Sequence, residues 1–150
     1  MSLLRVLAAV ALGLFAGANL AEGGLLVPYW RSLPAAEFFT WYAANDERLY
    51  SFFSRLTILT AVPVLAVAVI SWWKADSTRW LSICAGALLI GCIVMFPLYF
   101  EAANSSFSAA APSEPQLADE LARWSTWHWV RTVMAMVAFV LTVLAARTRD

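Results

Sequence analysis

The sequence predicts an all-α fold, an integral membrane four-helix bundle with both termini cytoplasmic. Of its 150 residues, 62% are hydrophobic and only 13% are charged, and the ten basic and ten acidic side chains balance. A soluble domain of this size could not bury so much apolar surface. Four apolar segments are each long enough to cross a hydrocarbon core of about 30 Å as a helix. We expect helices over residues 3–22, 46–73, 80–103 and 114–147 of a single membrane domain, residues 1–150.

The first segment has some features of a secretory signal peptide. Arg5 precedes its apolar stretch, and Ala18 and Ala21 lie where a signal peptidase could cut. The apolar run is, however, longer than a usual signal core. We therefore expect a retained helix.

The connection between the first two helices, from Gly23 to Asn45, is rich in aromatic residues and contains two prolines. A short interfacial helix after Pro34 would place its rings at the level of the lipid headgroups. Two interpretations follow, a lid over a binding pocket or a simple interfacial anchor. The rings are Tyr29, Trp30, Phe38, Phe39, Trp41 and Tyr42.

The third and fourth segments carry two further local signals. Cys84 and Cys92 lie eight residues apart in the third helix, about 12 Å along its axis, which is too far for a disulfide. The lack of a paired CxxC motif excludes small quinone-linked thiol oxidoreductases. Ser113 and Gln116 form a capping box that starts the fourth helix after a flexible loop.

Basic residues near the helix ends predict the orientation. Cytoplasmic segments of membrane proteins are enriched in lysine and arginine close to the helix ends. One side of the predicted bundle carries Arg5, Lys74, Arg79, Arg147 and Arg149. We expect this side to be cytoplasmic and the protein to lie in the inner (plasma) membrane of a bacterium.

Counting along the helices from these charges gives a depth for each polar residue of the spans. Arg131 lies sixteen residues before Arg147, which is about 24 Å from the inner face at 1.5 Å per residue. The same count gives similar heights, about 21 to 33 Å, for Asn19, Glu22, Arg55, Glu101 and His128. All four helices therefore contribute to one polar layer.

Charges at such depth are costly, about 2.5–3.5 kcal/mol each, so they face a bundle interior and form pairs. We expect Glu22 and Glu101 to pair with Arg55 and Arg131 in a pocket open toward the outer face. Helical phase supports this arrangement in the fourth helix, where one stripe is polar above and small below. Its members are Trp124, His128, Arg131, Ala135, Ala138 and Thr142.

Two short stretches carry a resemblance to a known family. PLYFEAAN at residues 97–104 and RWSTWHWVRT at residues 123–132, with four apolar segments in this order, resemble the anthrone oxygenase-like family of small four-helix membrane proteins. The resemblance covers most of the chain. It implies oxidation of polycyclic anthrones to anthraquinones by molecular oxygen, with neither a metal nor a flavin cofactor.

The resemblance also implies roles for individual residues. An anthrone reacts with oxygen after losing a proton, so the site needs a base, a cation for the oxyanion and flat walls for the rings. His128 would be the base and Arg131 the cation, as catalytic residues. The expected substrate-binding residues are Asn104, Trp124, Trp127, Glu22, Glu101, Arg55 and Asn19.

Other interpretations stay open at this point. Arg131 could serve only to fix helix register, and the tryptophans could form an interfacial belt. The chain could be a non-catalytic accessory or binding subunit of a larger membrane complex, or a homo-oligomer. A haem is disfavoured because a single histidine cannot supply two axial ligands, and a metal would need His128 with Glu22, Glu101 or Asn104. Membrane lipid and a hydrophobic small molecule are the expected partners. The sequence has no basic patch of the kind that binds nucleic acid, so we expect no nucleic-acid partner.

Overall fold

The fold is all-helical. The computed structural model describes residues 2–147, and no β-strand occurs among them. Arg149, one of the basic residues expected at the cytoplasmic end, lies outside the described residues. The elements are α1 (Ser2–Ala21), η1 (Glu22–Leu26), α2 (Val27–Ser32), α3 (Ala35–Trp73), α4 (Arg79–Met95), η2 (Phe96–Phe100), α5 (Glu101–Ser108) and α6 (Glu114–Arg147), where η marks a π-helix.

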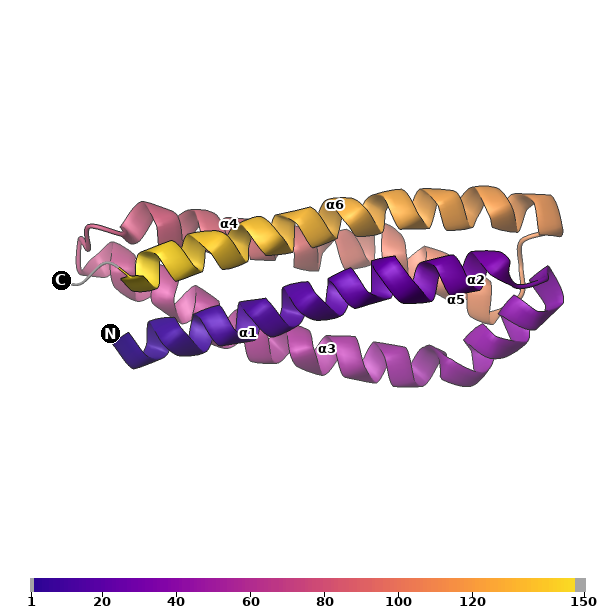
Figure 1. Cartoon of the computed structure of the whole chain (residues 1–150), viewed down its shortest axis with the longest axis horizontal. Helices are drawn as coiled ribbons and strands as arrows, with labels where there is room; N and C mark the ends of the chain where they lie inside the picture. The colour runs from indigo at the N-terminus through magenta and orange to yellow at the C-terminus, as the bar shows by residue number, and fades with distance from the viewer. Residues whose placement is uncertain (1, 148–150) are drawn as a thin grey trace.

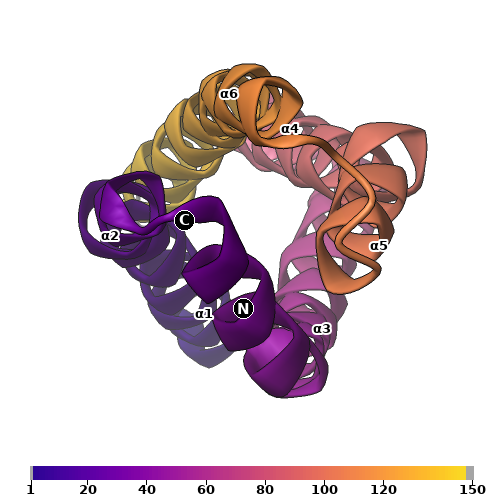
Figure 2. The same cartoon turned by 90° about the vertical axis from the view of Figure 1, so that its right-hand side faces the viewer.

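These elements join into four long rods, which run side by side in Figure 1. The rods are Leu3–Ser32, Ala35–Trp73, Arg79–Ser108 and Glu114–Arg147. Figure 2 shows them at the corners of a square, in which α1 and α4 each pack against both α3 and α6. The start of α1 and the end of α6 lie at the same end of the bundle.

All four rods are long and apolar enough to cross a membrane. Their outward faces carry large apolar side chains, for example Leu14 (63% exposed), Val62 (65%) and Val133 (55%). Exposing such an apolar surface to water would cost free energy, whereas contact with lipid chains would not. The chain is therefore an integral membrane protein.

Small residues lie at the helix contacts in the half that holds the two termini, beside larger core residues such as Leu12 and Leu89. Ala8, Ala85, Ala135 and Ala138 are at most 1% exposed. Small side chains let helices approach closely, which is how membrane helices associate without a hydrophobic driving force. The predicted small half of the α6 stripe is confirmed.

The helix ends differ from the prediction at three of the four rods. The second rod begins at Ala35 instead of residue 46, and Leu33–Pro34 is the only break between it and α2. The separate interfacial helix expected after Pro34 was therefore wrong. No glycine or proline follows Pro34 until Pro63, so nothing ends the helix earlier.

The first rod continues beyond its predicted end through η1 and α2, and the third continues beyond residue 103 to Ser108; each contains a π-helix beside a proline. Pro28 follows η1 in the first turn of α2, and Pro97 lies inside η2. Proline removes one backbone hydrogen bond and its ring clashes with the carbonyl four residues earlier. A wider π turn relieves that clash, so the helix bends around the proline instead of ending.

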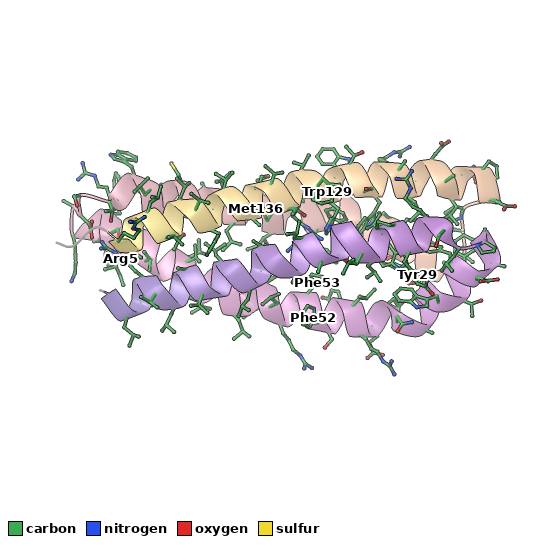
Figure 3. The ribbon with its side chains drawn as sticks, in the orientation of Figure 1. Arg5, Tyr29, Phe52, Phe53, Trp129 and Met136 are labelled. Carbon is green, nitrogen blue, oxygen red and sulfur yellow. The ribbon has the colours of Figure 1, made fainter. Side chains whose placement is uncertain are left out.

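The aromatic residues between the first two spans form a second core at the outer end. Trp30, Phe38 and Tyr42 are at most 3% exposed and pack with Phe107 and Trp124. These three rings are core residues of the bundle, and Tyr42 also lines the cavity described below. Tyr29, labelled in Figure 3, is the more exposed ring of this segment, at 44%.

Candidate functional site

A cavity of about 920 Å³ lies between α3 and the rod formed by α4, η2 and α5. Its deep wall is formed by Glu22 at the start of η1 and by Trp124 and Arg131 of α6. This volume is typical of small-molecule sites. The α3 wall contains Tyr42, Asp46, Tyr50, Phe53 and Thr57, and the opposite wall contains Cys92, Phe96, Pro97, Phe100, Glu101 and Asn104.

Both π-helices border this cavity. Glu22 opens η1, and Phe96 and Phe100 begin and end η2. A π turn adds one residue to the helix and redirects the side chains beside it, and such turns are common at functional sites. The local distortions therefore aim a carboxylate and two rings at the same space.

Glu22 and Arg131 form an ion pair at the bottom of the cavity. Arg131 Nη2 lies 3.3 Å from Glu22 Oε2, and the two side chains are 12% and 7% exposed. The guanidinium also lies over the ring of Phe100, 4.4 Å from its centroid. The Nε–H of Arg131 is buried and donates to no described group. Arg131 therefore has one N–H group available for a further hydrogen-bond acceptor.

His128 lies behind this pair and does not line the cavity. It is 0% exposed, and its Nε2 is 2.8 Å from the main-chain oxygen of Asn19. Arg131 Nη2 is 2.9 Å from Nδ1 of the same ring. A carbonyl only accepts and a guanidinium only donates, so Nε2 carries the proton and Nδ1 accepts. The geometry therefore fixes a neutral ring with both nitrogens engaged.

Two neighbours hold the histidine ring in place. Trp124 stacks on it with centroids 4.9 Å apart and planes 8° apart. Gly23 lies against its other side, where an added Cβ would be 3.0 Å from His128 Cδ2. An alanine here would press on the ring whose Nε2 reaches the Asn19 carbonyl, one turn earlier on the first rod.

Trp124 connects the histidine to the cavity wall. Its Nε1–H donates to Asn104 Oδ1 at 2.9 Å, and its ring packs edge-on against Phe100. Asn104 and Trp124 both line the cavity. The site thus has a charged pair, Glu22 and Arg131, at one end of the cavity and aromatic side chains along its walls.

The structure brings most of the predicted site residues together. Glu22, Arg131, His128, Asn104 and Trp124 meet as described, and the predicted pairing of Glu22 with Arg131 is confirmed. Asn19 contributes its main-chain oxygen, while its buried side chain donates to Phe15 O. Glu101 lines the cavity but is exposed and forms no ion pair with Arg131 among residues 2–147.

Two predicted members lie elsewhere. Trp127 is 44% exposed and packs against Tyr99, away from the cavity. Arg55 is exposed on the opposite face of α3, so its expected place in the pocket was wrong. Phe53 and Thr57 line the cavity, and a residue two positions away points about 200° around the helix.

Tyr42 and Asp46 are cavity residues that the sequence analysis did not identify. Tyr42 lies in the part of α3 that was expected to be a connection, and Asp46 is the first residue of the predicted second helix. A continuous helix through residue 35 would have placed them on the same stripe as Phe53 and Thr57. At the mouth, Ser108 Oγ donates to Asp46 Oδ2 at 2.6 Å, joining α5 to α3.

Metal binding finds no support in the described residues. Across residues 2–147, no three histidine, cysteine, aspartate or glutamate side chains are grouped so that they could hold a metal ion. His128, the central candidate ligand, has both ring nitrogens engaged.

Comparison with known proteins gives one result. The sequence model of the anthrone oxygenase family matches residues 38–141, more than two thirds of the chain. The match covers most of α3, all of α4, η2 and α5, and most of α6. It includes Asn104, Trp124, His128 and Arg131, and Glu22 lies outside it. No curated protein and no solved structure matches. The chain belongs to the anthrone oxygenase family.

Proposed function

We propose that the cavity binds a flat, hydrophobic anthrone-like substrate and that the protein catalyses its oxygenation to a quinone. The observation that carries this proposal is the Glu22–Arg131 pair facing a cavity of about 920 Å³ with aromatic walls. A base and a cation side by side are what the ionisation of a carbon acid needs. Family membership supports the same reaction.

Glu22 is the better candidate for the base than His128. Its carboxylate lines the cavity, and only Oε2 contacts Arg131 and His128, so Oε1 is free of both. His128 does not line the cavity, and its one lone pair already accepts from Arg131. We therefore assign His128 the role of orienting Arg131.

The proposed step keeps the charge of the site constant. Glu22 takes a proton from the ring methylene, and the electron pair of that C–H bond moves to the keto oxygen. As Glu22 becomes neutral, Arg131 exchanges its partner for the new oxyanion. Neither charge is left unpaired in a medium of low polarity, where an unpaired charge would be costly.

Molecular oxygen is the oxidant in the remaining steps. The anion gives its electrons to O₂ and forms a carbon–oxygen bond at the former methylene, and the resulting peroxide anion takes the proton back from Glu22 to become a hydroperoxide. Loss of the second C–H proton with cleavage of the O–O bond gives the second keto group and one water. Overall, one anthrone and one O₂ give one anthraquinone and one H₂O.

The experiment measures quinone absorbance and O₂ uptake with anthrone and purified protein in nanodiscs, after subtraction of the uncatalysed rate. Glu22→Gln should lower turnover by about 10²–10⁴-fold, the usual contribution of a positioned base. Glu37→Gln, which removes an exposed carboxylate outside the cavity, is the matched control. If wild type and Glu22→Gln oxidise anthrone at the same rate, the assignment of Glu22 fails; if the wild type adds nothing to the uncatalysed rate, the activity fails.

His128→Gln separates the two candidate bases. If His128 orients Arg131, this variant should show slower turnover with the same dependence of rate on pH as the wild type. If His128 is the base, the acid limb of that profile should vanish. The second result would return the base to His128.

We also propose that the protein lies in a bacterial inner membrane with both termini in the cytoplasm. The basic residues Arg5, Lys74, Arg79 and Arg147 lie toward the end where α1 begins, which supports this orientation. A green fluorescent protein fused to the C-terminus should fluoresce, and alkaline phosphatase fused there should be inactive. The reverse pattern would invert the topology.

A further inference from the structure

The outward face of α3 carries a second groove, on the side away from the cavity. Its volume is about 530 Å³. Phe53 faces the cavity and its neighbour Phe52, labelled with it in Figure 3, lines this groove. The groove is lined by Glu47, Arg48, Ser51, Phe52, Arg55, Leu56 and Leu59.

Both arginines of the groove are exposed and lack a carboxylate partner. Neither Arg48 nor Arg55 forms an ion pair with any residue between 2 and 147. Arg55 directly precedes the apolar run of the rod, where the exposed side chains are Leu59 (68%) and Val62 (65%). The groove therefore passes from a basic to a lipid-facing surface where the apolar run begins, at the expected level of the headgroups.

The spacing makes the polar part of the groove a single site. Arg48, Ser51 and Arg55 are at positions i, i+3 and i+7, which share one helical face. The arginines are about 10.5 Å apart along the axis, so two long side chains can converge on a group above Ser51. A tetrahedral anion offers enough oxygens for two guanidinium groups and a hydroxyl.

The apolar part of the groove continues the same stripe toward the middle of the rod. Leu59 and Val62 follow Arg55 at intervals of four and three residues. An acyl chain lying along them would begin beside the anion bound by the arginines. Glu47 borders the polar part, and its carboxylate would accept hydrogen bonds from an ammonium group on the same ligand.

We propose that this groove binds the headgroup of a glycerophospholipid from the outer leaflet. Arg48 and Arg55 hold the phosphate, Leu56 and Leu59 contact an acyl chain, and Glu47 favours a headgroup that carries an amine. The charge of the groove and its continuity with the lipid-facing surface select this occupant over a soluble phosphate. The site lies on the other face of α3 from the substrate cavity, with Glu47 at the edge of both, and it does not depend on the proposed reaction.

Native mass spectrometry of the full chain in detergent tests the site, with phosphatidylethanolamine as the probe and diacylglycerol as the lipid without phosphate. We expect the wild type to retain phosphatidylethanolamine and not diacylglycerol. Arg48→Gln with Arg55→Gln should weaken retention at least about tenfold. Arg31→Gln with Arg123→Gln, which removes two exposed arginines elsewhere, should leave it unchanged.

Three results would overturn the proposal. Equal retention of phosphatidylethanolamine by the wild type and the groove variant would show that the arginines do not hold the phosphate. Equal retention of diacylglycerol would show that the phosphate does not matter. If the wild type is a dimer in this experiment and the groove variant is a monomer that keeps its lipid, the groove belongs to a contact with a second copy of the chain. A circular dichroism spectrum matching the wild type checks that the variant is folded.

Discussion

At the scale of single residues, the site depends on how His128 is held. Its ring is clamped between Trp124 and the backbone at Gly23, and its two nitrogens join the carbonyl of Asn19 to the guanidinium of Arg131. Arg131 therefore meets Glu22 from a fixed direction. The orientation of the ion pair thus depends on a residue that does not line the cavity.

Gly23→Ala tests this clamp. The new methyl group would lie 3.0 Å from His128 Cδ2 and 3.3 Å from Trp129 Cζ2, and rings inside a bundle cannot move away cheaply. We expect a loss of about 1–3 kcal/mol of stability, as for other overpacked sites, and slower turnover. Thermal unfolding and anthrone oxidation in nanodiscs measure the two effects.

Gly24→Ala is the matched control. It adds the same methyl group one position later, where nothing lies within 4 Å. This variant should be at least as stable as the wild type, since alanine is the better helix former. Equal behaviour of the two variants would contradict the clamp.

The sequence predicts the height of a polar residue better than its direction. Counting from Arg147 and Arg5 placed Arg131 and Glu22 in one layer, and the 3.3 Å pair confirms it. The same count gave Arg55 a similar height, but its side chain lies on the other face of α3. Height follows from the helical rise alone, whereas direction needs the phase of the whole helix, and the true start of α3 was missed.

At the scale of elements, the two π-helices shape the site. Each lies where a proline enters a membrane span, and each borders the cavity. The first helix was predicted to end at residue 22, before Pro28, and the third to run through Pro97 to residue 103, whereas the two rods continue to Ser32 and Ser108. Proline does stop helices in water, but a membrane span has no water to satisfy freed backbone groups, so the helix continues with a wider turn.

Deletion of Gly24 would remove the extra residue of η1 and convert the turn to an α-helix. The flanking helices would keep their faces, so we expect a folded protein with near wild-type thermal stability. Glu22 would be redirected, and turnover should fall about a hundredfold, as for a misplaced catalytic group. Deletion of Gly17, in the regular α1, is the contrast, because it would rotate everything after it by about 100° and destabilise the bundle. Full activity of the Gly24 deletion variant would show that the π turn is not needed to position Glu22.

At the scale of the whole molecule, an ion pair with its hydrogen bonds joins the helices at the end opposite the cavity; we call it the ionic clip. Arg5, labelled in Figure 3, forms a buried ion pair with Asp76 of the connection between α3 and α4. Asp76 Oδ1 also accepts from the backbone N–H and the hydroxyl of Thr78, each at 2.8 Å. The clip ties the first rod to the second and third.

The clip predicts a dependence of stability on pH. Burial raises the pKa of Asp76, but the hydrogen bonds from Thr78 and the charge of Arg5 outweigh it, so the pKa lies below its ordinary value of 3.8. A carboxyl group with a lowered pKa stabilises the fold at pH values above its unfolded pKa and loses this effect as the pH falls through its folded pKa. The contribution should therefore be complete at neutral pH and disappear below about pH 4.

Asp76→Asn measures this contribution. At pH 7 it should lower the free energy of unfolding by about 1–3 kcal/mol, because charged hydrogen bonds are lost. The unfolding midpoints of variant and wild type, followed by circular dichroism in detergent, should converge as the pH falls below about 4. Asp119→Asn, at an exposed position of α6, should follow the wild type throughout. A constant difference between Asp76→Asn and wild type at every pH would contradict the assignment.

The position of the cavity has a kinetic consequence. Ile58, which is 63% exposed on the apolar part of α3, belongs to its lining, so the cavity reaches the flank of the bundle. A hydrophobic compound would then be able to enter from within the bilayer as well as through the mouth beside Ser108 and Asp46. For a compound that enters from the bilayer, the protein would respond to the mole fraction of the compound in the lipid. Adding more lipid to a fixed amount of compound should therefore lower the turnover rate, just as removing part of the compound would.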